Sequence, residues 1–77
     1  MCLNKINSEI AKIISSIIKL KPEEINPETK LKFSPYQQAD LLVKLEDKFN
    51  IPIKFTRIEE TKTFQNLSEY VGDLLKN

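Results

Sequence analysis

The sequence predicts an all-α fold, a small bundle of three to four helices with a long first loop, formed by one domain over residues 1–77. Three segments carry apolar residues at three- and four-residue intervals, which is the period of an amphipathic helix. The only glycine is Gly72, and valine and threonine are sparse, so the signals for hairpins are weak. A chain this short buries only about 60–65% of the surface that it exposes when unfolded, so we expect a thin core.

The first predicted helix lies in "NKINSEIAKIISSIIKL", residues 4–20. Pro22 is expected to close it, because a proline disfavours helical geometry in the residue before it. Isoleucine is a poor helix former, so tertiary packing must stabilise this helix. The apolar stripe that would face the core consists of Ile6, Ile10, Ile13, Ile14 and Ile17.

The connector "KPEEINPETKLKF", residues 21–33, is long for a helical bundle and is rich in charge and proline. Its strong apolar anchors are Ile25, Leu31 and Phe33. We expect these side chains to hold the loop across the core.

The second predicted helix runs from about Ser34 to Phe49, and Pro52 ends the segment. Its start reads Ser-Pro-Tyr-Gln, in which serine caps, proline occupies the first helical position and glutamine completes a capping box. The inner stripe is predicted to consist of Leu41, Leu42, Leu45 and Phe49.

A short helical turn is expected around "TRIEE", and a last helix begins after Thr63, which is the predicted cap. Gly72 lies inside that helix and costs about 1 kcal/mol against alanine, which suggests either close packing or early fraying there. The apolar positions of this helix are Phe64, Leu67, Val71 and Leu74, with Tyr70 and Leu75 beside them.

Composition excludes several classes of function. The net charge is +1, from 12 basic and 11 acidic residues, and the cations lack the density and aromatic interleaving of a nucleic-acid site. There is no histidine, and Cys2 is the single cysteine, so neither a metal cluster nor an internal disulfide is expected. No stretch is apolar enough for a membrane span or a signal sequence. We therefore expect a cytoplasmic monomer that is not an enzyme and binds neither nucleic acid nor membrane.

The order of three segments resembles the acyl and peptidyl carrier proteins. "DLLVKLEDKFNIPI" (40–53) is similar to the second helix of that family and its exit, and "TKTFQNLSEYV" (61–71) to the opening of its fourth helix. "IAKIISSIIKLKPEEINPETKL" (10–31) resembles its first helix and the following turn. The resemblance covers nearly the whole chain and implies a helical bundle of the acyl carrier protein type, acting in fatty-acid, polyketide or related thioester metabolism.

The resemblance also implies a cofactor. Members of the family carry 4′-phosphopantetheine on the serine of an Asp-Ser-Leu motif at the start of the second helix, where the positive end of the helix favours an anion. This chain reads Ser34-Pro35-Tyr36 at that place, so proline replaces the modified serine. Ser34, one residue early, is the candidate cofactor-binding residue, and a helix cap is the competing interpretation.

Carrier proteins present their second helix to partner enzymes, so the resemblance implies a docking face for acyl-transfer or acyl-modifying enzymes. Two interpretations remain open. In the favoured one the domain lacks the modified serine and acts as a protein-docking module; in the alternative it is a functional acyl or aminoacyl carrier with 4′-phosphopantetheine on Ser34. The docking residues that match the family's positions are Tyr36, Gln37, Asp40, Val43, Glu46 and Asp47.

Overall fold

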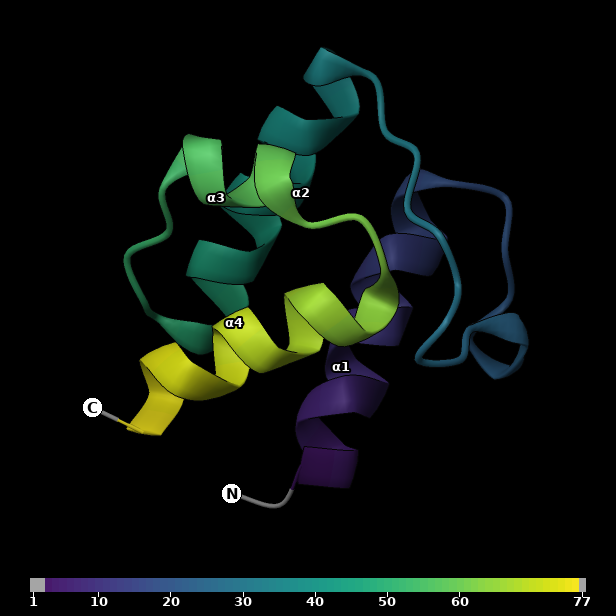
Figure 1. The fold of residues 1–77 in the computed structure, drawn as a ribbon, viewed down its shortest axis with the longest axis horizontal. Helices are drawn as coiled ribbons and strands as arrows, with labels where there is room; N and C mark the ends of the chain where they lie inside the picture. The colour runs from purple at the N-terminus through teal and green to yellow at the C-terminus, as the bar shows by residue number, and fades with distance from the viewer. Residues whose placement is uncertain (1–2, 77) are drawn as a thin grey trace.

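The computed structural model describes residues 3–76, and Cys2 lies outside them. Four α-helices and one 3₁₀ turn, joined by loops, lie within these residues. The prediction of a small all-α bundle with a long first loop is therefore confirmed (Figure 1). Helix α1 packs against α2 and α4, and the short α3 packs against α2. The elements in chain order are α1 (Leu3–Ile17), η1 (Pro22–Glu24), α2 (Pro35–Phe49), α3 (Phe55–Glu60) and α4 (Phe64–Lys76).

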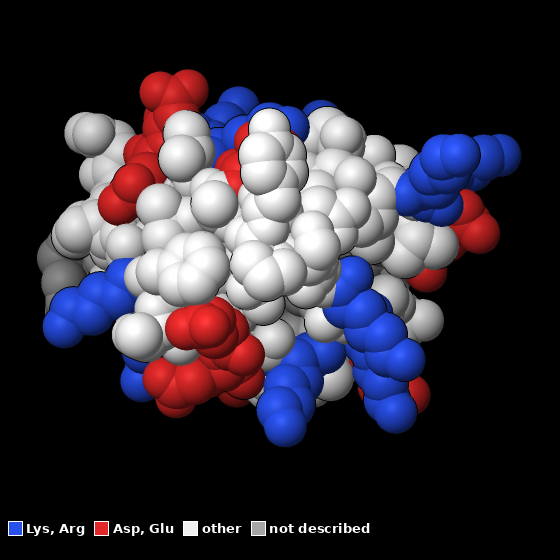
Figure 2. Space-filling view, turned by 90° about the horizontal axis from the view of Figure 1, so that it is seen from above, with Lys and Arg blue, Asp and Glu red and all other residues white. Residues whose placement is uncertain are grey.

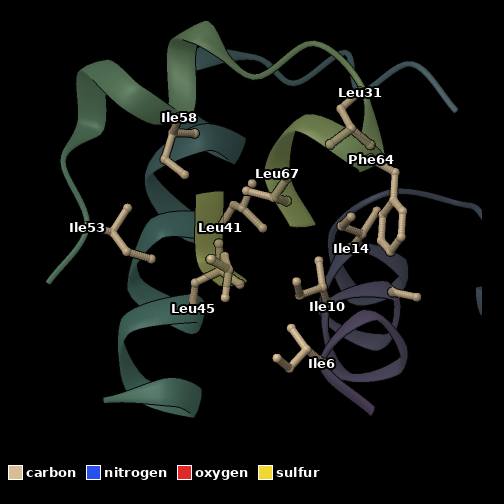
Figure 3. Close-up of a cluster of buried hydrophobic side chains, with 12 residues drawn as sticks. Ile6, Ile10, Ile14, Leu31, Leu41, Leu45, Ile53, Ile58, Phe64 and Leu67 are labelled. Atoms are coloured by element: carbon tan, nitrogen blue, oxygen red, sulfur yellow. The ribbon is translucent and has the colours of Figure 1, made fainter. Parts of the chain in front are cut away.

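The three long helices enclose one apolar core (Figure 3). Ile10 of α1, Leu41 of α2 and Leu67 of α4 are each completely shielded from solvent. One buried polar pair accompanies them, because the hydroxyl of Ser68 in α4 donates to the side-chain oxygen of Asn7 in α1. The buried hydrophobic residues are Ile6, Ile10, Ala11, Ile14, Leu31, Leu41, Leu45, Ile53, Ile58, Phe64, Leu67 and Val71.

Helix α1 ends earlier than the sequence predicts. Its last residue is Ile17, so Pro22 does not close it. The Ile18 N–H still bonds to the Ile14 carbonyl, but the Leu20 N–H turns back to the carbonyl of Ile18 at 2.9 Å. Ile18, just beyond the end of α1, still packs partly buried against the core.

The first loop is held against the start of α4. Lys30 and Thr63 form an isolated antiparallel bridge, flanked by a bond from the Leu31 N–H to the Lys62 carbonyl at 2.9 Å. The Phe64 N–H bonds to the carbonyl of Thr29, also at 2.9 Å. The predicted anchors of this loop are confirmed, because Leu31 is buried and Ile25 and Phe33 pack partly buried against the core.

The predicted limits of α2 and the predicted start of α4 are confirmed. Helix α2 ends at Phe49, and Asn50 follows it as the C-cap with a φ of 54°, the left-handed conformation that terminates many helices. The hydroxyl of Thr63 accepts the N–H of Asn66 at 3.2 Å and so caps α4. No helix within residues 3–76 is long and apolar enough to cross a membrane.

Gly72 has neither of the two expected roles. A β-carbon built on it meets no atom within 4 Å, so nothing packs closely there. Helix α4 continues past it to Lys76. The glycine therefore costs the helix conformational entropy without a compensating contact.

We expect Gly72→Ala to raise the free energy of unfolding by about 1 kcal/mol, because alanine restricts the unfolded chain and fits the helix without a clash. Urea denaturation followed by far-UV circular dichroism measures this change. A fall in stability would contradict the open surroundings of residue 72.

Candidate functional site

The start of α2 is organised around Ser34. Its hydroxyl oxygen accepts the N–H of Gln37 at 3.2 Å, and its own N–H donates to the Gln37 side-chain oxygen at 2.9 Å. Pro35 occupies the first helical position, so the capping box predicted from the sequence is confirmed. Ser34 is therefore the N-cap of α2, whatever further role it has.

The same turn does not fit a phosphodiester. An anion at a helix start is bound by free backbone N–H groups. Pro35 has no N–H, and the N–H of Gln37 is already bonded to Ser34. Of the first three helical positions, only Tyr36 has an N–H that remains available among the described contacts. The cap thus occupies the Gln37 N–H, which would otherwise be free to bind the phosphate of 4′-phosphopantetheine.

The outer face of α2 exposes two large apolar side chains. Tyr36 is 84% exposed and Val43 60% exposed, whereas every other large apolar side chain described, apart from Phe55, is at least partly covered. Tyr36, Asp40, Val43 and Asp47 follow one another at four-, three- and four-residue steps, so they lie on one side of the helix. We call these four residues the outer stripe.

The view onto the start of α2 shows how charge is arranged around this part of the surface. Most of the middle of that face is uncharged, and acidic and basic side chains both lie around its margin (Figure 2).

The acids of α2 differ in their local contacts. Asp40 pairs with Lys44 one turn later at 3.2 Å, so part of its charge is neutralised within the helix. Asp47 is exposed and forms no ion pair with any residue of the described chain. Glu46 accepts the N–H of Ile53 at 2.9 Å and is half-buried, so it holds the loop that leaves α2.

Two of the six predicted docking residues therefore hold the two ends of α2. Gln37 completes the cap at one end of α2, and Glu46 fixes the chain beyond the other end. A docking role for these two side chains stays a prediction. The four residues of the outer stripe are brought together on one exposed face.

The basic residues near the end of α2 are divided between two neighbouring helices. Lys48 pairs with Glu9 of α1 at 3.1 Å, and the hydrogen bond from Lys48 lowers the pKa of the Glu9 carboxyl. Arg57 lies 5.1 Å above the ring of Tyr70 in α4, where a surface hollow of about 370 Å³ opens. These contacts join helices within the protein.

A larger hollow, of about 450 Å³, lies at the bridge between the first loop and the start of α4. Lys30, Lys32 and Lys62 surround it, and none of them was singled out from the sequence. Both segments that line the hollow contain the dipeptide Thr-Lys. No pattern in the sequence predicts that residues so far apart along the chain lie next to each other. Only the folded chain brings these three lysines together.

No protein-family model matches the chain, and no curated protein matches it at a significant level. We therefore infer the function from the geometry of α2 and of the surface around it.

We expect Ser34→Ala to lower the free energy of unfolding by about 1 kcal/mol, because the N–H of Gln37 loses its acceptor. Ser34→Asp supplies a carboxylate acceptor and is expected to retain most of the stability. Urea denaturation of both variants, with amide hydrogen exchange at Gln37, tests the cap. Equal stability of Ser34→Ala and wild type would show that the cap contributes nothing.

The contacts of Glu46 and Asp47 predict opposite results for two neighbouring acids. Glu46→Ala leaves the Ile53 N–H without its charged acceptor and is expected to cost about 1–2 kcal/mol of unfolding free energy. Asp47→Ala removes an exposed charge and should change stability by less than about 0.5 kcal/mol. Thermal denaturation measures both, and Glu46→Gln, which keeps an acceptor, should recover part of the loss.

Proposed function

We propose that this protein is an acyl-carrier-like docking module of fatty-acid, polyketide or related thioester metabolism. It binds an acyl-transfer or acyl-modifying enzyme through the outer stripe of α2 and works without a prosthetic group on Ser34. The proposal assigns the domain no catalysis of its own.

The observation that carries this proposal is that Tyr36 and Val43 are both exposed on the same side of α2. Tyrosine at the centre of an interface buries a large rigid surface and commonly supplies much of the binding energy. A thin-cored chain of 77 residues gains nothing in stability from leaving such a side chain in water. A partner protein that covers the Tyr36 ring explains why this side chain is exposed in the free domain.

The acids of the outer stripe support the same proposal. Asp40 and Asp47 lie on the same side of α2 as the apolar pair, and Asp47 forms no ion pair within the described chain. Uncompensated charge at the margin of an interface speeds the encounter with a partner of opposite charge. A basic surface on the partner enzyme is therefore expected.

The local contacts of Ser34 support the absence of the prosthetic group. Its hydroxyl is committed to the cap, and proline follows it where the family has the modified serine. One observation favours the alternative function of an acyl or aminoacyl carrier: Ser34 is solvent-exposed, so a transferase has access to the hydroxyl.

Intact-mass spectrometry after incubation with coenzyme A and a broad-specificity phosphopantetheinyl transferase tests the two functions. We expect no mass change in the wild type. A matched control restores the family's motif through Ser34→Asp, Pro35→Ser and Tyr36→Leu, and it is expected to gain one phosphopantetheine. A gain in the wild type that disappears in Ser34→Ala would establish the carrier instead.

A second experiment tests docking. The unmodified, ¹⁵N-labelled protein is titrated by NMR with each member of a panel of ketosynthases and acyltransferases. Amide shifts are expected along the outer stripe, and Tyr36→Ala should weaken binding by about tenfold or more. Phe55→Ala removes an aromatic side chain on a different helix and serves as the control. Unchanged binding by Tyr36→Ala would contradict docking through this face.

A further inference from the structure

The hollow beside the first loop is built from two extended segments that pair antiparallel. Lys30, Leu31 and Lys32 supply one side, and Lys62 and Thr63 supply the other. The bridge between Lys30 and Thr63 fixes the two backbones relative to each other. Main-chain hydrogen bonds therefore fix the backbone that carries the lining side chains.

The side chains around the hollow alternate in direction. Leu31 is buried in the core, whereas Lys30 and Lys32 on either side of it are exposed, as expected for an extended segment. Lys62 is exposed across the bridge. Three lysines thus line a hollow whose surface is largely apolar, because lysine stems contribute carbon and only their ends are charged.

These three cations are not neutralised within the protein. All the ion pairs found among residues 3–76 involve other lysines, namely Lys12, Lys44 and Lys48. The chain as a whole is almost neutral, so this cluster is a local concentration of positive charge. A ligand bearing several negative charges meets three free partners here.

The backbone at this place does not offer a site for a small anion. Helix α4 begins beside the hollow, but the N–H of Phe64 bonds to Thr29 and that of Gln65 to the Pro27 carbonyl at 3.0 Å. The N–H of Asn66 is taken by the Thr63 hydroxyl, and that of Leu67 by the Thr63 carbonyl. A lone phosphate would find no converging N–H groups, so the available recognition is apolar contact plus separated charges.

From this arrangement we propose that the hollow binds an acidic segment of a partner protein. An apolar side chain of that segment enters the hollow, and carboxylates on both sides of it pair with Lys30, Lys32 and Lys62. This surface is distinct from the outer stripe and has the opposite charge, so the proposal does not rest on the docking function of α2.

A capped peptide of sequence Asp-Glu-Leu-Glu-Asp is the probe, titrated into the ¹⁵N-labelled full chain. Amide shifts are expected at residues 30–32 and 62–63. Combined Lys30→Ser, Lys32→Ser and Lys62→Ser substitution should weaken binding about tenfold or more, because it removes three close charge pairs. Replacing the leucine of the peptide by serine should weaken binding by about threefold, the cost of a lost apolar contact.

A matched control variant carries Lys5→Ser, Lys19→Ser and Lys76→Ser, which remove the same charge from exposed positions elsewhere. Its affinity for the peptide should stay within about twofold of the wild type, since distant surface charges are screened by salt. Circular dichroism checks that both triple variants fold. If the first does not, Lys62→Ser alone replaces it, with an expected loss of about threefold.

Three results would overturn the proposal. Equal weakening by the control variant would mean attraction by net charge alone. Inorganic phosphate that produces the same shifts and displaces the peptide would mean a small-anion site. Self-association in sedimentation equilibrium that disappears in the first variant would make a second copy of this chain the occupant.

Discussion

Ile10, Leu41 and Leu67 come from three different helices and lie together with no exposure to solvent (Figure 3). The rest of the structure depends on this shared apolar centre, because a chain of 77 residues has little else to offset the entropy of folding. Helix α1 is rich in isoleucine and is held by packing more than by its own propensity. The apolar stripe continues past the last helical residue, Ile17, to Ile18, which still contacts the core.

The core also fixes what lies on the surface. With Leu41 and Leu45 turned inward, the opposite side of α2 must carry Tyr36, Asp40 and Val43. The N-cap at Ser34 and the bond from the Ile53 N–H to Glu46 define the two ends of that helix. The backbone of the face proposed for docking is therefore held at both ends of the helix. This lowers the entropic cost of binding a partner.

Two surfaces of opposite character result from one nearly neutral chain. The outer stripe of α2 combines an exposed aromatic ring with acids, and the hollow at the first loop combines an apolar lining with lysines. Lys32 lies two residues before Ser34, so the loop that lines the hollow leads directly into α2.

Spacing and local hydrogen bonds are enough to predict the helical periods, the caps at Ser34 and Thr63 and the inward positions of Leu41, Leu45 and Leu67. The end of α1, the structural contact of Glu46 and the meeting of Lys30, Lys32 and Lys62 appear only in the folded chain. The lysines come together because two segments far apart in sequence pair, and Glu46 reaches Ile53 beyond the end of its own helix, so no periodic pattern records either contact. Close packing, one of the two expectations for Gly72, is absent, since the space around a helix residue is set by its neighbours in the fold.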